Sequence, residues 1–277
     1  MAGRVVTAAS TARKVEGVRI ARILGHTITR VEAKGKHLLV TFERPENPPY
    51  PTTDVETSEA NCANEDHEAE GASPGAFVLQ THMLMTGSWH LYQAGVPWKR
   101  PARQATIVIE AGDRVAVGFN VPVVRLETVN HLRTERSLSR LGPDILASNF
   151  DLAEVLQRLS NQPVDRAIGE VLLDQRIVAG IGNIYRCEAL FAQRLHPWRT
   201  LGGVAEVERS SLLQVARDLM RANLNVDVGR DFGNRPNESF VYRRAGRPCR
   251  CCGAAVQSKL LGAQARRAYW CPACQVE

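Results

Sequence analysis

The sequence lacks any long apolar run. No segment reaches the roughly 18 consecutive apolar residues of a membrane-spanning helix, and the opening MAGRVVTAASTARK has no apolar core of the kind that a signal peptide carries. These absences lead us to expect a cytoplasmic or nucleoid-associated protein that is not attached to a membrane. At 277 residues, 44% of them apolar, the chain is long enough for one or two domains with a real core.

Lysine and arginine are absent from residues 46–75, which carry eight acidic side chains and several Pro, Ser and Ala residues. This segment has no hydrophobic periodicity, so we predict a disordered surface insertion. Without these eight, the chain holds 35 basic and 21 acidic side chains, a net charge of +14 instead of +6. Such a balance favours a polyanionic partner such as nucleic acid, although a basic soluble protein of another kind has a similar composition.

Cysteine is scarce before the last 29 residues, which hold five of the seven. Cys249 and Cys252 form one CxxC pair, and after eighteen residues Cys271 and Cys274 form a second. Two such pairs are typical of a structural site in which four thiolates bind one Zn²⁺ tetrahedrally, with no open position for a catalytic water. Cys251 is then a spare thiol. Disulfide pairing is the alternative, which the odd cysteine count and the lack of a secretion signal disfavour.

Period-two apolar patterns predict a β-rich first half, and helical periodicity predicts a helical second half with no internal repeat. In the first half, strands are expected over residues 18–24, 26–33, 36–42, 76–93, 105–112 and 114–128. In the second half, helical patterns cover residues 150–160, 166–175, 183–195 and 206–224. Asp151 is the expected N-cap of the first helix.

The segment VAGIGNIY at residues 178–185 joins two predicted helices. Gly180 and Gly182 permit close backbone approach, and the following helix would offer its free N–H groups and positive dipole end to an anion. Asn183 would add a side-chain donor at the helix cap. A plain turn between helices accounts for the motif equally well.

Two further segments place cations at predicted turns. GAQARRAYWCPACQ predicts a β-hairpin with Arg266 and Arg267 near its tip, and a rigid hairpin with a forked cation is suited to binding a phosphate. Lys36 lies at a strand turn, where its ammonium could steer phosphates or transfer a proton. Solvated surface side chains are the alternative at both turns.

Taken together, these segments resemble the formamidopyrimidine-DNA glycosylase/endonuclease VIII family. The resemblance rests on GKHLL at 35–39, THMLMTGSWHLY at 81–92, LGPDIL at 141–146, LLDQRIVAGIGNIYRCEALF at 172–191, HPW at 196–198 and RRAYWCPACQ at 266–275. The segment VAVGFNVPVVRLE stands where formamidopyrimidine glycosylases carry Arg-Arg-Phe-Gly. The chain is therefore most similar to an actinobacterial-type endonuclease VIII branch.

The resemblance implies an α+β fold in three parts. Residues 1–130 would form an N-terminal β-sandwich without the family's first helix, residues 131–240 a helix-two-turn-helix DNA-binding domain, and residues 241–277 a zinc finger. Such proteins bind bent double-stranded DNA that contains damaged bases or abasic sites, and we expect a monomer with one structural Zn²⁺.

The resemblance also implies roles for individual residues. Lys36 and Arg266 match residues that the family uses in catalysis, and Met85 matches one that fills the gap left by the extruded base. Asn183, with the helix that follows it, would hold the phosphates that flank the lesion. Arg267 is a weaker candidate than Arg266 for the arginine that contacts phosphate. The expected DNA-binding residues are Lys36, Met85, Gly182, Asn183, Arg266 and Arg267.

The family's chemistry uses an N-terminal proline amine, which forms a Schiff base at the sugar C1′, and an adjacent glutamate. Here the sequence begins Met1-Ala2-Gly3-Arg4, and AGRVVT resembles the stretch after the family's first helix. We therefore expect the nucleophile and its acid partner to be missing from this sequence. A start assigned too far downstream is the favoured explanation, because the other motifs are intact.

Three functions follow from these interpretations. The first is a DNA glycosylase and abasic-site (AP) lyase of base excision repair, acting on oxidised bases. If the nucleophile is truly lost, the alternative is a non-catalytic protein that binds damaged DNA or abasic sites. The least favoured is a zinc-ribbon interaction module on an unrelated β scaffold.

Overall fold

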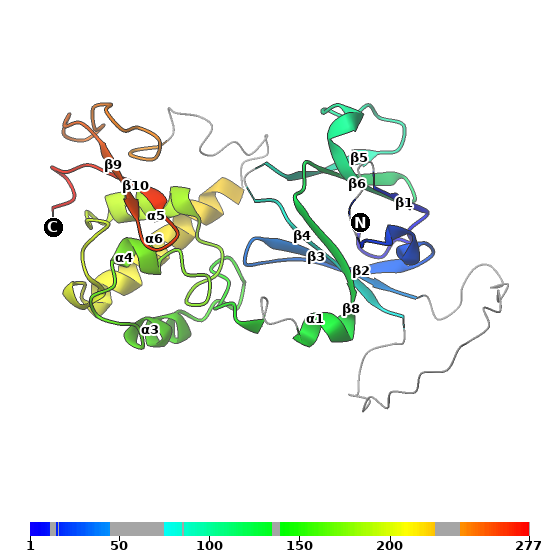
Figure 1. The fold of residues 1–277 in the computed structure, drawn as a ribbon, viewed down its shortest axis with the longest axis horizontal. Coiled ribbons are helices and arrows are strands. Elements are labelled where there is room, and N and C mark those ends of the chain that lie inside the picture. Colours follow the sequence, from blue (N-terminus) through cyan, green and yellow to red (C-terminus); the bar gives the residue numbers. More distant parts are fainter. Residues whose placement is uncertain are drawn as a thin grey trace. The chain divides into compact units, whose positions relative to one another are not determined.

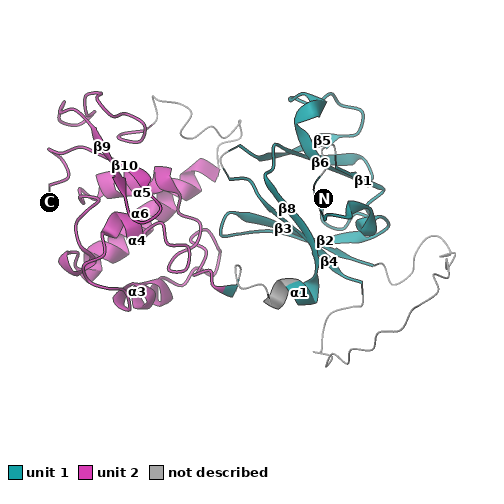
Figure 2. Cartoon of the chain, viewed as in Figure 1, with its two compact units in different colours: residues 1–139 teal, residues 140–277 magenta. Residues whose placement is uncertain are grey.

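The computed structural model describes residues 1–11, 15, 17–44, 75–84, 86–134, 139–224 and 239–276. Contacts divide the chain into two compact units, residues 1–139 and 140–277 (Figure 2). Met85 and, apart from Gly75, the predicted insertion at 46–75 lie outside the described residues. No helix within the described ranges is long and apolar enough to cross a membrane.

The first unit contains two antiparallel four-stranded sheets (Figure 1). One sheet has the order β2 (Thr27–Lys34), β3 (His37–Glu43), β4 (Phe77–His82), β8 (Val123–Thr128). The other has the order β1 (Ala8–Ser10), β6 (Ala105–Ala111), β7 (Arg114–Phe119), β5 (Ser88–Gln93). Phe42 and Leu79 from one sheet share a buried core with Ile107 and Ile109 from the other, so the two sheets pack as layers.

One strand prediction is wrong. Residues 18–24 contain the 3-10 helix η1 (Ile20–Ile23) where a strand was expected. Ile20 and Ile23 are both buried, and a spacing of three residues places them on one face of a 3-10 turn. Alternation alone does not separate these two structures in so short a segment. The unit also contains the short helices η2 (Ala102–Gln104) and α1 (Val129–Thr134).

The strand turn that the sequence predicted at Lys36 is confirmed between β2 and β3. Gly35 and Lys36 form the two-residue connection, with φ of 53° and 71°. Positive φ at both central residues is typical of a tight hairpin turn that matches the twist of its strands. The exposed Lys36 side chain therefore stands at a hairpin tip.

The second unit is helical, and its core is formed by apolar faces of its helices. Its helices are α3 (Leu152–Ser160), α4 (Ile168–Val171), α5 (Asn183–Ala192), η3 (Leu201–Gly203) and α6 (Glu206–Leu224). The predicted N-cap of α3 is confirmed, because Asp151 Oδ1 accepts from the Glu154 N–H at 3.0 Å. The predicted helix over 166–175 is reduced to the four residues of α4, after which the chain enters a turn.

The predicted C-terminal hairpin is confirmed, with β9 (Gln257–Leu261) paired to β10 (Arg266–Trp270). Arg266 pairs with Leu261, so it occupies the last rung before the turn. The hairpin lies against α5, where Cys187 and Phe191 share a buried cluster with Cys271 (Figure 1). Because of this cluster the cysteine-bearing hairpin belongs to the same compact unit as the helices.

Candidate functional site

The turn before α5 leaves the start of that helix open. Gly180 has a φ of +105°, a backbone conformation that residues other than glycine rarely adopt. Gly182 is the N-cap in an extended conformation, and within the described residues no side chain caps α5. The first-turn N–H groups of a helix have no intrahelical partner, so an uncapped start is suited to binding an anion.

Asn183 does not cap α5, contrary to the sequence-based expectation. It is the first helical residue, and Gly182 has the extended backbone that an N-cap requires. The Asn183 Nδ2 instead donates to the backbone carbonyl of Arg267 at 3.0 Å. An amide nitrogen carries two hydrogens, so one donor of Asn183 holds the hairpin while a second can serve a ligand.

The two hairpin arginines differ in what holds them. Both side chains are exposed. The Arg267 guanidinium donates to Ser258 Oγ at 3.2 Å, across the hairpin. In the described part of the chain, no group engages the guanidinium of Arg266. Arg266 is thus the hairpin cation that is ready for an external anion.

Arg186 was not singled out by the sequence interpretation. Its side chain is fully buried, and its guanidinium donates to the backbone carbonyls of Gly169 and Arg266, both at 3.4 Å. Asn183 and Arg186 are three residues apart on α5, so they share a helix face. Together they contact consecutive carbonyls at the hairpin tip and hold it against the helix start.

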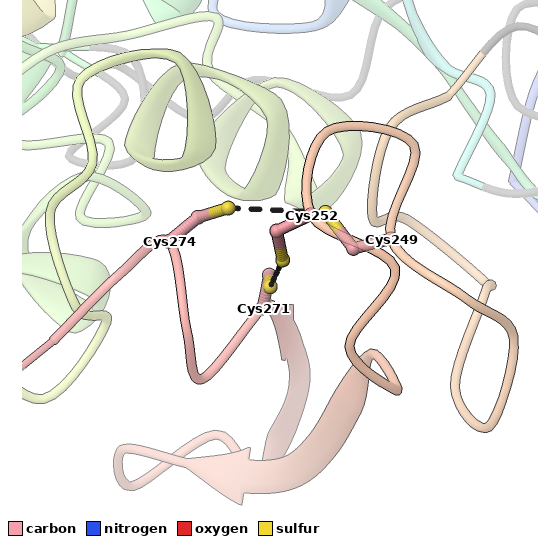
Figure 3. Close-up of side chains that lie close together, drawn as sticks. All are labelled: Cys249, Cys252, Cys271 and Cys274. Carbon is pink, nitrogen blue, oxygen red and sulfur yellow. Dashed lines mark hydrogen bonds between the residues drawn. The ribbon is translucent and has the colours of Figure 1, made fainter.

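The four predicted metal ligands lie together (Figure 3). Their sulfur atoms are all within 4.8 Å of one another. The Sγ atoms of Cys249 and Cys274 are 3.9 Å apart, and those of Cys252 and Cys271 are 3.4 Å apart. Thiolates bound to Zn²⁺ at 2.3 Å in a tetrahedron are about 3.8 Å apart. The donor set and its spacing therefore fit one tetrahedral zinc ion.

These thiols differ in how readily they ionise. Although burial opposes ionisation, the backbone N–H groups of Cys251 and Cys252 lower the pKa of Cys249 to about 7. Burial, and then the nearby Cys252 thiol, raises the pKa of both Cys271 and Cys274. Without a cation, crowded thiols share their protons because adjacent negative charges repel.

Two buried polar side chains join this cysteine cluster to α5 and the loop after it. Gln275 accepts from the Cys271 N–H at 2.9 Å and donates to the Leu195 carbonyl at 2.8 Å. The Glu188 carboxylate accepts from the N–H groups of three consecutive residues, 240–242, at 2.8–3.1 Å. Neither residue carries a sequence signal, since each resembles an ordinary polar residue of a helix or loop.

Lys36 lies in the first unit, beside a residue that the sequence interpretation missed. Burial, and then the positive charge of Lys36, lowers the pKa of His82 below 6.5. His82 Nδ1 accepts from the backbone N–H of Leu84 at 3.0 Å, which leaves the proton of the neutral ring on Nε2. A lysine ammonium and an imidazole N–H donor therefore occur close together near this hairpin tip.

The structure thus gathers Gly182, Asn183, Arg266 and Arg267 on the second unit and places Lys36 on the first. Cys251 is exposed beside the cluster, with its N–H directed to Cys249 Sγ at 3.4 Å.

Comparison with known proteins identifies relatives of both sequence and fold. The family described as "Formamidopyrimidine-DNA glycosylase H2TH domain" matches residues 141–231. "Probable endonuclease 8 2" of Streptomyces coelicolor is 33% identical over 278 residues, covering 99% of this chain and 88% of that protein. A protein of Mycolicibacterium smegmatis named DNA-(apurinic or apyrimidinic site) lyase is 32% identical over 203 residues, covering 73% of this chain and 76% of the relative.

Solved structures of more distant proteins have a similar fold. A crystal structure of the formamidopyrimidine-DNA glycosylase of Lactococcus lactis, non-covalently bound to DNA containing an AP site, has a TM-score of 0.71. It is 21% identical, and the match covers 100% of this chain and 94% of that chain. At this identity the likeness concerns the fold.

Proposed function

The chain belongs to the formamidopyrimidine-DNA glycosylase/endonuclease VIII family, and from this membership we propose that it is a DNA glycosylase and AP lyase of base excision repair. Its substrate is double-stranded DNA with an oxidised base or an abasic site, and it acts as a monomer with one structural Zn²⁺. The names of the relatives support the activity, since they include an endonuclease 8, an AP lyase and a formamidopyrimidine-DNA glycosylase.

One observation carries the DNA-binding part of this proposal. The uncapped start of α5 lies beside the tip of the cysteine hairpin, because Asn183 donates to the Arg267 carbonyl. We propose that the backbone N–H groups, one amide donor and the Arg266 guanidinium bind the DNA backbone together. Phosphate oxygens accept from all three kinds of donor, and guanidinium binds phosphate in a forked geometry. Two phosphates flanking a lesion are the ligands that this arrangement suits.

Lys36 supplies a second set of donors from the first unit. Its ammonium, with the nearby His82 N–H, is suited to a phosphate and to proton transfer during elimination.

Met85 remains the predicted residue that fills the gap left by an extruded base. Extrusion costs a few kcal/mol and least at a damaged base, so it contributes to selectivity.

The covalent step requires an amine. In the reaction we propose, the amine nitrogen attacks the sugar C1′, the bond from C1′ to the base breaks, and the base leaves with a proton. The bond from C1′ to the ring oxygen then breaks and this oxygen takes up a proton, which leaves an iminium ion at C1′. The iminium ion permits loss of a proton from C2′ and elimination of the 3′ phosphate. Family resemblance assigns this amine to an N-terminal proline.

Zinc has a structural part in this proposal. Cys249, Cys252, Cys271 and Cys274 would hold the ion, which would fix the hairpin that carries Arg266. Because four thiolates complete a tetrahedral shell, no reaction step passes through the metal.

Borohydride trapping tests the proposal, since borohydride reduces an imine to a stable covalent bond. The protein as printed and the same protein preceded by a Pro-Glu segment are incubated with duplex containing one abasic site. A trapped adduct with either protein, together with strand cleavage, is the expected result. Salt-sensitive binding that prefers the abasic duplex, without an adduct from either protein, would instead support the non-catalytic binder. Absence of any preference for the abasic duplex would contradict both the enzymatic function and the non-catalytic binding function.

A further inference from the structure

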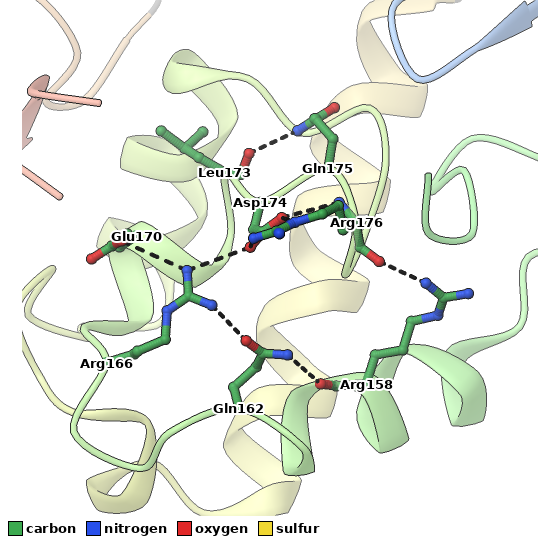
Figure 4. Close-up of polar contacts among 8 residues, drawn as sticks. All are labelled: Arg158, Gln162, Arg166, Glu170, Leu173, Asp174, Gln175 and Arg176. Carbon is green, nitrogen blue, oxygen red and sulfur yellow. Dashed lines mark hydrogen bonds and ion pairs between the residues drawn. The ribbon is translucent and has the colours of Figure 1, made fainter. Parts of the chain in front are cut away.

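The side chain of Gln175 makes three hydrogen bonds within the turn that leads into α5. Its Oε1 accepts from the Gly180 N–H at 2.9 Å. Its Nε2 donates to the carbonyls of Leu173 and Ile181, both at 3.1 Å (Figure 4 draws the Leu173 contact). One side chain thus spans the turn from its beginning to the residue just before the N-cap of α5.

These hydrogen bonds engage backbone N–H and carbonyl groups that could otherwise bind a ligand. Gly180 gives its N–H to Gln175, and Ala179 gives its N–H to the Pro143 carbonyl at 2.9 Å. The left-handed conformation of Gly180 then redirects the chain. As a result the N–H groups of Ala179 and Gly180 are engaged within the turn, and the start of α5 that follows it has no side-chain cap.

The residues around Gln175 are themselves held in place (Figure 4). Asp174 is paired with Arg176 at 2.8 Å and with Arg166 at 3.5 Å. The bond from the Arg176 side chain is the main reason why the pKa of Asp174 is lowered. Arg158 donates to the Arg176 carbonyl at 2.7 Å, which ties this turn to α3. Gln175 therefore extends from a fixed base, so its side chain can impose a geometry on the glycine turn.

We propose that Gln175 is a positioning residue for phosphate binding: it sets the path of the turn so that the open N–H groups at the start of α5 face the DNA backbone. This inference rests on the proposed function and adds a residue that does not itself touch the phosphate. Neutral N–H donors carry no charge, so their contact with a phosphate releases no counterions. Losing their alignment should therefore weaken binding without changing how affinity depends on salt. Losing Arg266 removes a charged contact and should reduce that salt dependence.

The test compares Gln175→Met, nearly equal in volume, with wild type. Affinity for a duplex carrying a stable abasic-site analogue is measured from about 50 to 200 mM salt. Gln175→Met should bind about tenfold more weakly, as expected for loss of one good hydrogen bond to a charged group, with the slope of log affinity against log salt unchanged. Gln175→Glu, which keeps the acceptor for the Gly180 N–H but adds a negative charge, should bind more weakly still.

Gln162 provides the matched control. Its side chain is bonded to the Arg158 carbonyl at 3.2 Å and to the Arg166 guanidinium at 2.6 Å, and neither bond involves the glycine turn (Figure 4). Gln162→Met should lose some stability and keep wild-type affinity. An affinity of Gln175→Met within twofold of wild type, or an equal loss in Gln162→Met, overturns the inference. If wild type itself does not prefer the abasic duplex, the proposed function fails instead.

Discussion

The side-chain amide of Asn183 donates to the backbone carbonyl of Arg267 across 3.0 Å, joining residues 84 positions apart in the chain. This bond places the start of α5 beside the tip of the hairpin. The same helix start is uncapped, and the neighbouring Arg266 guanidinium is uncommitted within the described residues. One hydrogen bond therefore links the two features that we propose bind phosphate, and each can be tested separately.

Asn183→Ala removes both the tie to the hairpin and a donor for DNA. We expect affinity for abasic duplex to fall about tenfold or more, because a charge-assisted hydrogen bond is lost and the hairpin tip is released. Zinc content should stay at one ion per chain. Fluorescence anisotropy measures the affinity, and Asn161→Ala, an exposed asparagine at the end of α3, is the control. An unaltered affinity would remove Asn183 from the site.

Arg266→Ala should weaken binding to all duplex sequences about equally, because a phosphate contact carries no base information. The slope of log affinity against log salt should decrease in magnitude by about 0.9. Arg267→Ala should leave this slope nearly unchanged, since its guanidinium is held by Ser258. Titrations at several salt concentrations measure both slopes. Equal slopes for Arg266→Ala and wild type would refute the assignment.

Removal of the metal should release the hairpin from α5. Structural zinc contributes about 10 kcal/mol or more of apparent binding energy in small zinc domains, so chelation should cost the second unit several kcal/mol of stability. Cys271→Ser should reproduce this loss, whereas Cys251→Ser should keep full zinc content and stability. Metal analysis with thermal unfolding distinguishes the two variants. Equal loss in both would assign Cys251 to the metal shell.

The pair Lys36 and His82 should make the stability of the protein depend on pH. Burial and then Lys36 lower the pKa of His82 below 6.5. The unfolded chain therefore takes up a proton that the folded chain resists, and stability should fall as pH decreases through about 6.5. Denaturant unfolding at about pH 5.5 and pH 7.5 measures this change, which should be smaller in His82→Gln.

The contribution of Lys36 can be isolated by NMR titration of His82. Lys36→Met removes a nearby positive charge, so the pKa of His82 should rise toward its ordinary value. An unchanged titration would show that burial alone sets this pKa. The stability measurement would then say nothing about Lys36.

Local patterns in the sequence were sufficient for much of the fold. The N-cap at Asp151, the strand turn at Lys36 and the hairpin that precedes Cys271 all depend on neighbours within a few residues, and all three are confirmed. The four thiols could be grouped from their spacing, because two CxxC pairs at this separation are typical of a single zinc site. The 3-10 helix at Ile20–Ile23 was predicted as a strand, because a short apolar run fits both periods.

Tertiary structure alone decided which polar groups remain available to a ligand. Whether Asn183 caps a helix or holds a hairpin depends on Arg267, and the role of Gln175 depends on a turn closed by Gly180. The buried Arg186 likewise has its partners in Gly169 and Arg266, far along the chain. A residue's type fixes how many hydrogen bonds it can make, but only the folded chain fixes the partners that use them.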